Sequence, residues 1–483
     1  MNSLAKDATL LTISKIVTLI VNMGTVMLLS RFRTLIEYGT YSEINTINTI
    51  VVSIFALGLP TSVSYFLNKT TIENEKKMFL SNYFSIASIM GIVIAIVMTV
   101  ACPFLIKYYN NTLLYDYKFA ILLLPWVTII NNSADNVFIS YDKIKILINY
   151  RLSYSLTILS ICVFVIYFGL SFRIYMMAFI GAQIIYALLV YVISSRLSGG
   201  VKFSFNRTIT KEILSYSIPL GIAAVVSTIN IELDNIMIGG FFSTQDLAVY
   251  SNMSKELPYN ILSIAVATVL IPKMIYMLNN KKTDEAIHLW AVSIRLSAFV
   301  ICLAGAATFV FSNQIISVLY SEKYLTGIWV FRVYSITSLV KITSWGIILN
   351  ATKNNKYVMQ VSVIILCANL ILNYLFLNFI GMIGAALATA ISEFLGVILK
   401  LWHSAKVINY GFSNVIPWKD LGIILSINII GATVFCYINS YMLNTKLNKY
   451  ISMIIMGVLW MGIYYVIFRK KIQEDIKQLN NMK

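Results

Sequence analysis

Long apolar stretches, separated by short charged or Asn- and Gly-rich gaps, are the dominant pattern along this chain. A helix needs about 20 mostly apolar residues in a row to cross the hydrocarbon core of a bilayer, and the stretches reach this length. The pattern predicts an all-α polytopic membrane protein with about fourteen transmembrane helices. These helices are expected to start near Ala8, Tyr38, Leu80, Tyr117, Ile146, Ile174, Ile213, Leu247, Leu289, Gly327, Tyr357, Ile383, Asp420 and Tyr450.

Three of these helices, the second, seventh and eighth, also contain polar residues, so a plain hydropathy scan could miss one of them. Proline interrupts the same helices, at Pro60, Pro219, Pro258 and Pro272. Because proline cannot donate a backbone hydrogen bond, we expect either simple kinks or hinges at these positions.

The composition supports a membrane environment. The chain is 59% hydrophobic and only 12% charged, and its mean hydropathy is +0.80. A water-exposed surface would need more polar residues than this, so lipid must form part of the solvent. The five cysteines lie singly inside apolar segments without metal-type spacing. The N-terminus is expected to be a retained first helix.

The formal net charge of +17 is best explained by membrane topology. Cytoplasmic loops of membrane proteins are enriched in Lys and Arg. With the N-terminus inside, 24 of the 37 basic residues fall in cytoplasmic segments and 8 in external ones. Both termini are therefore predicted to be cytoplasmic. Nucleic-acid binding is disfavoured because no basic cluster is interleaved with aromatic residues.

A weak internal repeat recurs at an offset of about 209 to 212 residues. The segment GTYS at Gly39 matches AVYS at Ala248, and each opens the second helix of its half. Repeated halves are typical of alternating-access transporters. The repeat predicts an N-lobe over residues 1–200, a C-lobe over 201–410, and two additional helices with a cytoplasmic tail over 411–483.

Four features carry a family resemblance: the segment RFRTLIEYGTYS from Arg31, the segment LDNIMIGGFFSTQDLAVYS from Leu233, the run IGMIGAALATAISEF from Ile380, and the twelve-plus-two helix layout. With them the chain resembles the polysaccharide transporters of the multidrug/oligosaccharidyl-lipid/polysaccharide exporter superfamily, which include O-antigen and capsule repeat-unit flippases. The chain departs from the family's usual Leu-Gly-Pro at Thr34, Leu35 and Ile36.

The resemblance implies a MATE/MurJ-like fold, with two six-helix lobes in a V around a central cavity. It also implies a bacterial cytoplasmic-membrane protein that moves undecaprenyl-diphosphate-linked oligosaccharide units to the outer leaflet by alternating access. The implied partners are this lipid-linked glycan, membrane lipid, and a polysaccharide polymerase or another export protein. A teichoic-acid precursor flippase and an ion-coupled drug exporter of the same superfamily remain as alternatives.

Polar residues follow helical spacing within several apolar spans, and such residues normally face a cavity or a partner. A diphosphate would need cations, and sugars would need an aromatic ring and amide groups. The candidate substrate-binding residues are therefore Lys15, Asn22, Lys255, Arg295, Arg332, Lys341 and Trp345. The strongest candidate is Lys341, near mid-span, in a stripe with Tyr334, Ser338 and Trp345.

Each of these cations has a simpler alternative. Long basic side chains also reach to the membrane interface, or pair with a carboxylate such as Glu43, Glu232, Asp234, Glu256 or Glu393. A carboxylate at Asp234 could bind Na⁺ or H⁺ and couple transport to an ion gradient, although a structural role for this residue is at least as well supported.

Enzyme motifs are missing from the sequence. There is no phosphate-binding Gly-rich loop, nucleophile elbow or His-Glu-x-x-His, and there are only two histidines. A glycan polymerase would be expected to carry a large Arg-rich external loop, which the spacing of the spans leaves no room for. We therefore expect a transporter without catalytic residues or a resident cofactor.

The glycines and alanines of the predicted twelfth helix form a different kind of face. Gly384, Ala385 and Ala388 belong to a small-residue pattern that suits close helix packing. We expect this face to pack against a neighbouring helix.

Overall fold

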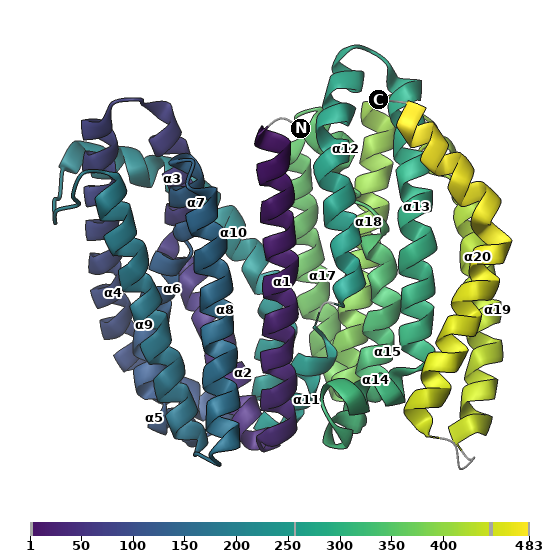
Figure 1. Cartoon of the computed structure of the whole chain (residues 1–483), viewed down its shortest axis with the longest axis horizontal. Helices are drawn as coiled ribbons and strands as arrows, with labels where there is room; N and C mark the ends of the chain where they lie inside the picture. The colour runs from purple at the N-terminus through teal and green to yellow at the C-terminus, as the bar shows by residue number, and fades with distance from the viewer. Residues whose placement is uncertain (1–2, 256, 444–447, 482–483) are drawn as a thin grey trace. The chain divides into compact units, whose positions relative to one another are not determined.

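The computed structural model describes residues 3–255, 257–443 and 448–481, and in these ranges the regular structure is entirely helical (Figure 1). Eleven of the described helices are long and apolar enough to cross a membrane, and a twelfth span is formed if the bent pair α2 and α3 counts as one. The chain is therefore an all-α, multi-pass membrane protein, as predicted.

The predicted count of fourteen is not confirmed by length and apolarity alone. The segments predicted as the fourth and eighth spans are each broken into shorter helices, α6 with α7 and α11 with α12. The second span is bent by 43° between α2 and α3, where Leu57 and Gly58 adopt left-handed backbone conformations and Pro60 lies in the first turn of α3. The seventh span, α10, is continuous despite its internal Pro219.

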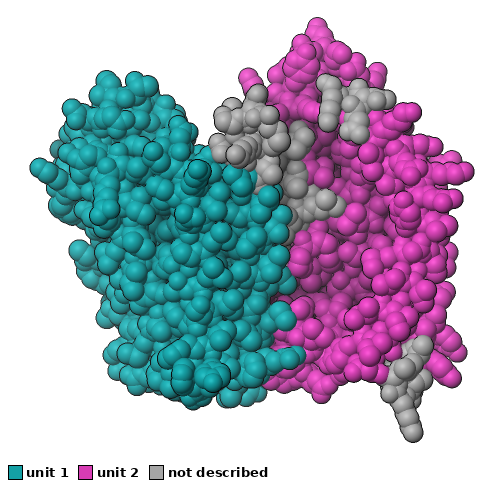
Figure 2. Space-filling model, in the orientation of Figure 1, with its two compact units in different colours: residues 1–249 teal, residues 250–483 magenta. Residues whose placement is uncertain are grey.

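Residues Met1–Val249 form one compact unit, unit 1 (Figure 2). Within it α1 packs against α8, α4 and α9 pack against α6, and α2 packs against α6 and α10. Its helices are α1 (Ser3–Phe32), α2 (Leu35–Ala56), α3 (Leu59–Lys69), α4 (Glu73–Tyr109), α5 (Leu113–Asp116), α6 (Lys118–Asn131), α7 (Ala134–Ser140), α8 (Ile144–Tyr167), α9 (Phe172–Leu197) and α10 (Arg207–Phe241), with α11 (Thr244–Met253) beginning in this unit and ending in the next.

Residues Tyr250–Lys483 form a second compact unit, unit 2. Its central helix is α13, which packs against α12, α15, η3, α19 and α20. The elements are η1 (Pro258–Asn260), α12 (Ile261–Asn279), α13 (Thr283–Val310), α14 (Ser312–Leu319), η2 (Glu322–Gly327), α15 (Ile328–Thr337), η3 (Ser338–Ile342), α16 (Ile347–Ala351), α17 (Asn355–Ile380), α18 (Met382–Val407), η4 (Phe412–Asn414), α19 (Trp418–Leu443) and α20 (Lys449–Asn481).

The start of α2 is fixed by a capping box. Thr34 accepts a hydrogen bond from the backbone of Glu37, whose side chain accepts one from the Thr34 backbone. The same reciprocal pair recurs between Ser243 and Asp246 at the start of α11. This pairing satisfies backbone N–H groups that would otherwise lack a partner. Both boxes lie at the offset that separates Gly39 from Ala248, so the sequence repeat has a structural counterpart at these two helix starts.

Small residues bring α17 and α18 together, as the sequence predicts. A Cβ atom on Gly384 would lie 2.4 Å from the backbone oxygen of Phe376 in α17, closer than any side chain tolerates. Ala385 and Ala388 are fully buried. The predicted packing face is confirmed.

The compact units do not follow the lobe boundaries expected from the repeat. Helix α10 packs against α2, α3 and α4, so unit 1 extends to Val249 rather than to residue 200. The compact units are defined by which helices pack together in this conformation, whereas the lobes are defined by the sequence repeat, so the two boundaries need not coincide. The lobes over residues 1–200 and 201–410, and their V-shaped arrangement, stay predictions.

Candidate functional site

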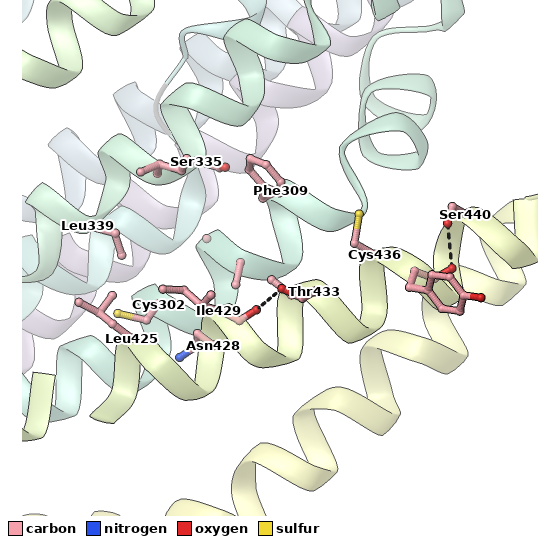
Figure 3. A pocket seen from close by; sticks show the side chains of 15 residues that line it. Cys302, Phe309, Ser335, Leu339, Leu425, Asn428, Ile429, Thr433, Cys436 and Ser440 are labelled. Carbon is pink, nitrogen blue, oxygen red and sulfur yellow. Dashed lines mark hydrogen bonds between the residues drawn. The ribbon is translucent and has the colours of Figure 1, made fainter. Parts of the chain in front are cut away.

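Unit 2 contains a cavity of about 620 Å³ between α13, the α15–η3 segment and α19 (Figure 3). Its walls are mostly apolar, and α19 contributes more than half of its lining residues. Ile429 and Tyr437, both on α19, line the cavity and are 65% and 78% exposed. The cavity is thus open along one side, at a surface of apolar side chains.

The hydroxyl groups in the cavity wall are directed at their own helices. Thr433 donates to the Ile429 carbonyl at 2.9 Å and Ser440 to the Tyr437 carbonyl at 2.8 Å (Figure 3). Because each hydroxyl donates to a carbonyl of its own helix, a molecule in the cavity does not have to accept a hydrogen bond from it. The wall therefore suits a hydrocarbon chain.

Asn428 is the polar exception in this wall. Its side chain is 3% exposed, and its amide nitrogen lies 2.8 Å from the Ile424 carbonyl and 3.3 Å from the Tyr464 hydroxyl. Its amide oxygen is buried without a hydrogen-bond partner among the described residues. A buried acceptor of this kind is costly unless a donor reaches it.

One predicted cation lies beside the cavity. The Arg332 guanidinium lies 5.2 Å from the ring centre of Phe309, which lines the cavity, and 4.7 Å from that of Trp329. Its Nε donates to the Ser312 hydroxyl at 2.9 Å. These contacts hold the guanidinium next to Phe309 at the cavity wall. A guanidinium can bind phosphate oxygens through paired donors.

The predicted stripe through Lys341 is interrupted. Helix α15 gives way to the 3₁₀ turn η3 after Thr337, and Thr343 is extended, so helical spacing does not continue to Trp345. The predicted single helical face is therefore wrong in its geometry. The physical reason is that the backbone leaves the α-helical path before Lys341.

Lys341 nevertheless has a charged environment that the sequence did not reveal. Lys400 of α18 lies close enough to Lys341 and to Glu393 for their charges to interact. Trp345 donates its indole N–H to the Val340 carbonyl at 2.6 Å and packs against the core of unit 2. The binding roles of Lys341 and Trp345 stay predictions, with Lys400 as a second cation near the first.

The remaining predicted cation in the core of unit 2, Arg295, forms a salt bridge. It is 7% exposed, lies 2.6 Å from a carboxylate oxygen of Asp475 in α20, and 3.3 Å from one of Asp420 in α19. Neither acid was among the partners considered from the sequence. These ion pairs account for the burial of Arg295 without a ligand, while its predicted role in binding stays untested.

The other predicted residues are distributed over different elements. Lys15 and Asn22 lie exposed on α1, and Asp234 is 5% exposed within α10. Lys255 is half-buried and donates to the Asn252 amide oxygen at 2.9 Å. Its predicted partner, Glu256, lies outside the described residues. Ion coupling at Asp234 and substrate binding by these residues stay predictions.

Comparison with known proteins agrees with this architecture. Residues 28–328, more than half of the chain, match the family model described as "Polysaccharide biosynthesis protein". An uncharacterized membrane protein of Methanocaldococcus jannaschii is 24% identical over 465 residues, covering 90% of this chain and 89% of that protein. The capsular polysaccharide biosynthesis protein CapF of Staphylococcus aureus is 22% identical over 214 residues, 43% of this chain and 54% of CapF.

Relatives named as flippases match over shorter segments. A probable lipid II flippase MurJ of Rhizobium meliloti is 26% identical over 129 residues, covering 26% of this chain and 24% of that protein. The chain thus spans about a quarter of that relative and about half of CapF.

Two solved structures share the fold. The lipid II flippase MurJ in an inward closed conformation superposes with a TM-score of 0.75, 18% identity, and coverage of 95% of this chain and 99% of that one. An inward-facing multidrug resistance MATE family transporter gives a TM-score of 0.66 at 16% identity, over 83% of this chain and 98% of the transporter. The chain belongs to the polysaccharide biosynthesis protein family and has the fold of the multidrug/oligosaccharidyl-lipid/polysaccharide exporter superfamily.

Proposed function

We propose that this protein is a flippase that moves undecaprenyl-diphosphate-linked oligosaccharide repeat units from the cytoplasmic to the outer leaflet of a bacterial membrane. The observation that carries the proposal is the apolar cavity of unit 2, open along one side and flanked by the Arg332 guanidinium. A hydrocarbon chain joined to an anionic head group matches both features. The family, and relatives named for lipid II flipping and capsule synthesis, support the same reading.

In this proposal the prenyl chain enters the cavity from the lipid. A volume of about 620 Å³ lies within the usual range of ligand pockets, so the cavity takes part of the chain and the rest stays among lipids. Arg332 binds the diphosphate through paired donors. Lys341 and Lys400 form a second cationic position for the head group as alternating access carries it across.

The proposal also includes orientation and chemistry. Both termini lie in the cytoplasm, because the basic residues concentrate in the segments on that side. The protein changes the leaflet of its substrate and makes or breaks no covalent bond. Coupling to Na⁺ or H⁺ provides the driving force.

Reconstituted proteoliposomes provide the test. The purified chain is placed in vesicles with a fluorescent undecaprenyl-diphosphate-linked oligosaccharide, and access of a membrane-impermeant quencher reports the leaflet. We expect flipping by the intact chain, and at least a tenfold loss in Ala432→Phe, which fills the cavity. The matched control is Ile430→Phe, also on α19 but 64% exposed and outside the cavity lining. Equal rates in the two variants would remove the cavity from the mechanism.

The alternatives are separate arms of the same assay. A lipid-linked polyol phosphate replaces the oligosaccharide lipid in one arm, and a cationic dye replaces it in another. Transport of the polyol lipid alone would identify a teichoic-acid precursor flippase. Transport of the dye alone would identify a drug exporter and overturn the proposal.

A further inference from the structure

Glu43 in unit 1 carries a buried carboxyl group whose hydrogen-bond partners are neutral side chains. The Glu43 side chain in α2 is 0% exposed. One of its oxygens, Oε2, accepts a hydrogen bond from the Asn111 amide at 2.6 Å, and the other, Oε1, lies 2.7 Å from the Thr244 hydroxyl at the start of α11. Asn111 also donates to the Thr40 hydroxyl at 2.9 Å.

No positive charge compensates Glu43 in the described part of the chain. Its only polar partners are the neutral groups of Asn111 and Thr244, and no basic residue lies within ion-pair distance of it. The N-terminus of α11, which would favour a negative charge, already has the carboxylate of Asp246 in its capping box. An isolated buried carboxylate is one of the most costly groups a protein can hold.

The orientation of the Asn111 amide is fixed independently. Its oxygen accepts a hydrogen bond from the backbone N–H of Leu113 at 3.0 Å, so its NH₂ group must point towards Glu43 and Thr40. The NH₂ group occupies the position that a metal ion would need between these oxygens. The arrangement therefore disfavours Na⁺ at this position.

The two contacts match a neutral carboxylic acid atom by atom. Its carbonyl oxygen would be Oε2, which accepts from Asn111. Its O–H would be on Oε1, facing the Thr244 hydroxyl, which accepts as well as donates. Every polar atom of the acid would then have a partner, without a buried charge.

The same carboxyl group lies where α11 meets α2. A Cβ atom on Gly39 would be 2.1 Å from the Thr244 backbone oxygen, so the two backbones are in direct contact. Three residues beyond Glu43, Thr46 donates to Glu232 of α10 at 2.9 Å. We call this contact of α2 with α10 and α11 the clasp, defined by Gly39, Glu43, Thr46, Glu232 and Thr244.

Other titratable groups around Glu43 are few. From α4, the Tyr109 hydroxyl interacts electrostatically with Glu43 and with Glu232 of α10. From α11 the nearest acid is Asp246, engaged in its cap. No charged group on α1, α5 or α6 in the described chain interacts with Glu43. Its ionisation therefore depends on burial within the clasp.

We propose that Glu43 is a proton-binding site and that its bound proton keeps the clasp closed. When the O–H bond of the acid breaks, the proton passes to water and the carboxylate is left with two neutral donors in a dry site. Water must then enter to solvate the charge, and Thr244 separates from Glu43. Proton binding reverses these steps. The proposal concerns this chain alone and does not depend on the lipid that it moves.

Infrared difference spectroscopy on the purified full chain tests the proton directly. We expect a carbonyl band of a protonated carboxylic acid at neutral pH that disappears on alkalinisation. It should be absent from Glu43→Gln, which has the shape and hydrogen bonds of the neutral acid. It should remain in the control Glu212→Gln, where an exposed carboxylate of unit 1 is removed. Thr244→Val should keep the band but shift its frequency, because one hydrogen bond is lost.

The clasp itself is tested by cysteine accessibility. Ala248 in α11 is fully buried, and Ala248→Cys is introduced into a chain whose five native cysteines are replaced by alanine. The reference is Glu212→Cys at an exposed position of unit 1, because the thiolate fraction of any cysteine rises with pH. We expect the alkaline-to-neutral ratio of maleimide labelling rates to be at least tenfold larger at Ala248→Cys than at this reference, and the two ratios to be equal when Glu43→Gln is added.

Three outcomes would overturn the proposal. They are an acid band that survives in Glu43→Gln, a band that disappears when Na⁺ is added at constant pH, and labelling of Ala248→Cys that changes with pH no more than labelling of the exposed reference Glu212→Cys. Because neither experiment contains a lipid-linked sugar, the failure of this proposal and that of the flippase function are distinguishable.

Discussion

Removing the carboxylate of Asp475 should destabilise unit 2 strongly. Asp475 is 1% exposed and accepts three hydrogen bonds from the Arg295 guanidinium, at 2.6 to 3.2 Å. Its loss leaves a buried guanidinium with only Asp420, at 3.3 Å. The Arg295–Asp475 pair joins the C-terminal part of α20 to the central helix α13, and the contact of Arg295 with Asp420 joins α13 to the start of α19.

The magnitude follows from burial. Breaking a buried ion pair by removing one partner costs about 3–5 kcal/mol. Asp420 keeps part of the compensation, since its side chain is about one-third exposed and remains hydrated. For Asp475→Ala we therefore expect a loss of about 3 kcal/mol in the free energy of unfolding, at the low end of this range.

The assay is unfolding of the purified chain in mixed micelles by increasing SDS, followed by circular dichroism. The double variant Arg295→Met/Asp475→Leu removes both charges and should lie within about 1 kcal/mol of the intact chain, because no buried charge is left unpaired. The control Glu285→Ala breaks the exposed pair with Lys282 and should cost under about 0.5 kcal/mol. A cost below about 1 kcal/mol for Asp475→Ala, or a double variant as unstable as the single one, would refute the reasoning.

Three further predictions concern other parts of the molecule. Gly39→Ala should cost about 1–3 kcal/mol in the same assay, since its Cβ would collide with the backbone of α11, whereas Gly457→Ala, with nothing within 4 Å, should not destabilise. Arg332→Gln should raise the substrate concentration for half-maximal flipping about tenfold, the effect of losing about 1.4 kcal/mol of binding free energy. Arg332→Lys keeps the positive charge but loses the paired N–H donors of the guanidinium, so it should restore only part of the lost affinity. Between α18 and α19, the hydrogen bond to the Asp284 carboxylate raises the pKa of Tyr410. This contact should therefore be present below the ordinary tyrosine range and be lost as pH rises through the raised pKa. The difference in ultraviolet titration between the intact chain and Tyr410→Phe isolates this tyrosine, and it should move to lower pH when both chains carry Asp284→Asn.

Much of the fold is predictable because each membrane-spanning helix requires a long apolar stretch that is visible directly in the sequence. Apolar stretches must be helical, since no water satisfies the backbone inside the bilayer. The predicted starts therefore fall within or close to described helices, as at Leu289 in α13 and Ile383 in α18. Of the three spans in which polar residues and proline interrupt the signal, the structure bends the second between α2 and α3 and divides the eighth into α11 and α12. The seventh, α10, stays continuous across Pro219, so such an interruption does not by itself predict a break.

The site is less predictable because its parts meet only after folding. The cavity joins α13, α15 and α19, which are more than a hundred residues apart at the extremes. Asn428 carries the one visible signal, a polar residue in the middle of an apolar span. Lys400 was assigned to the cytoplasmic boundary by its position in the sequence, and only the packing of η3 on α18 brings it near Lys341.

A polar residue within an apolar span indicates that a partner exists, but the identity of the partner decides the role. Arg295 and Glu43 were both visible in the sequence as ionisable residues in apolar helices. Arg295 is surrounded by two carboxylates, so its charge is compensated within the fold and contributes to stability. Glu43 has only an amide and a hydroxyl, which suit the neutral acid as well as the anion. A buried ionisable group with neutral partners can change its charge without breaking an ion pair, and this property makes Glu43, more than the predicted cations, a group through which pH can act on the position of α11.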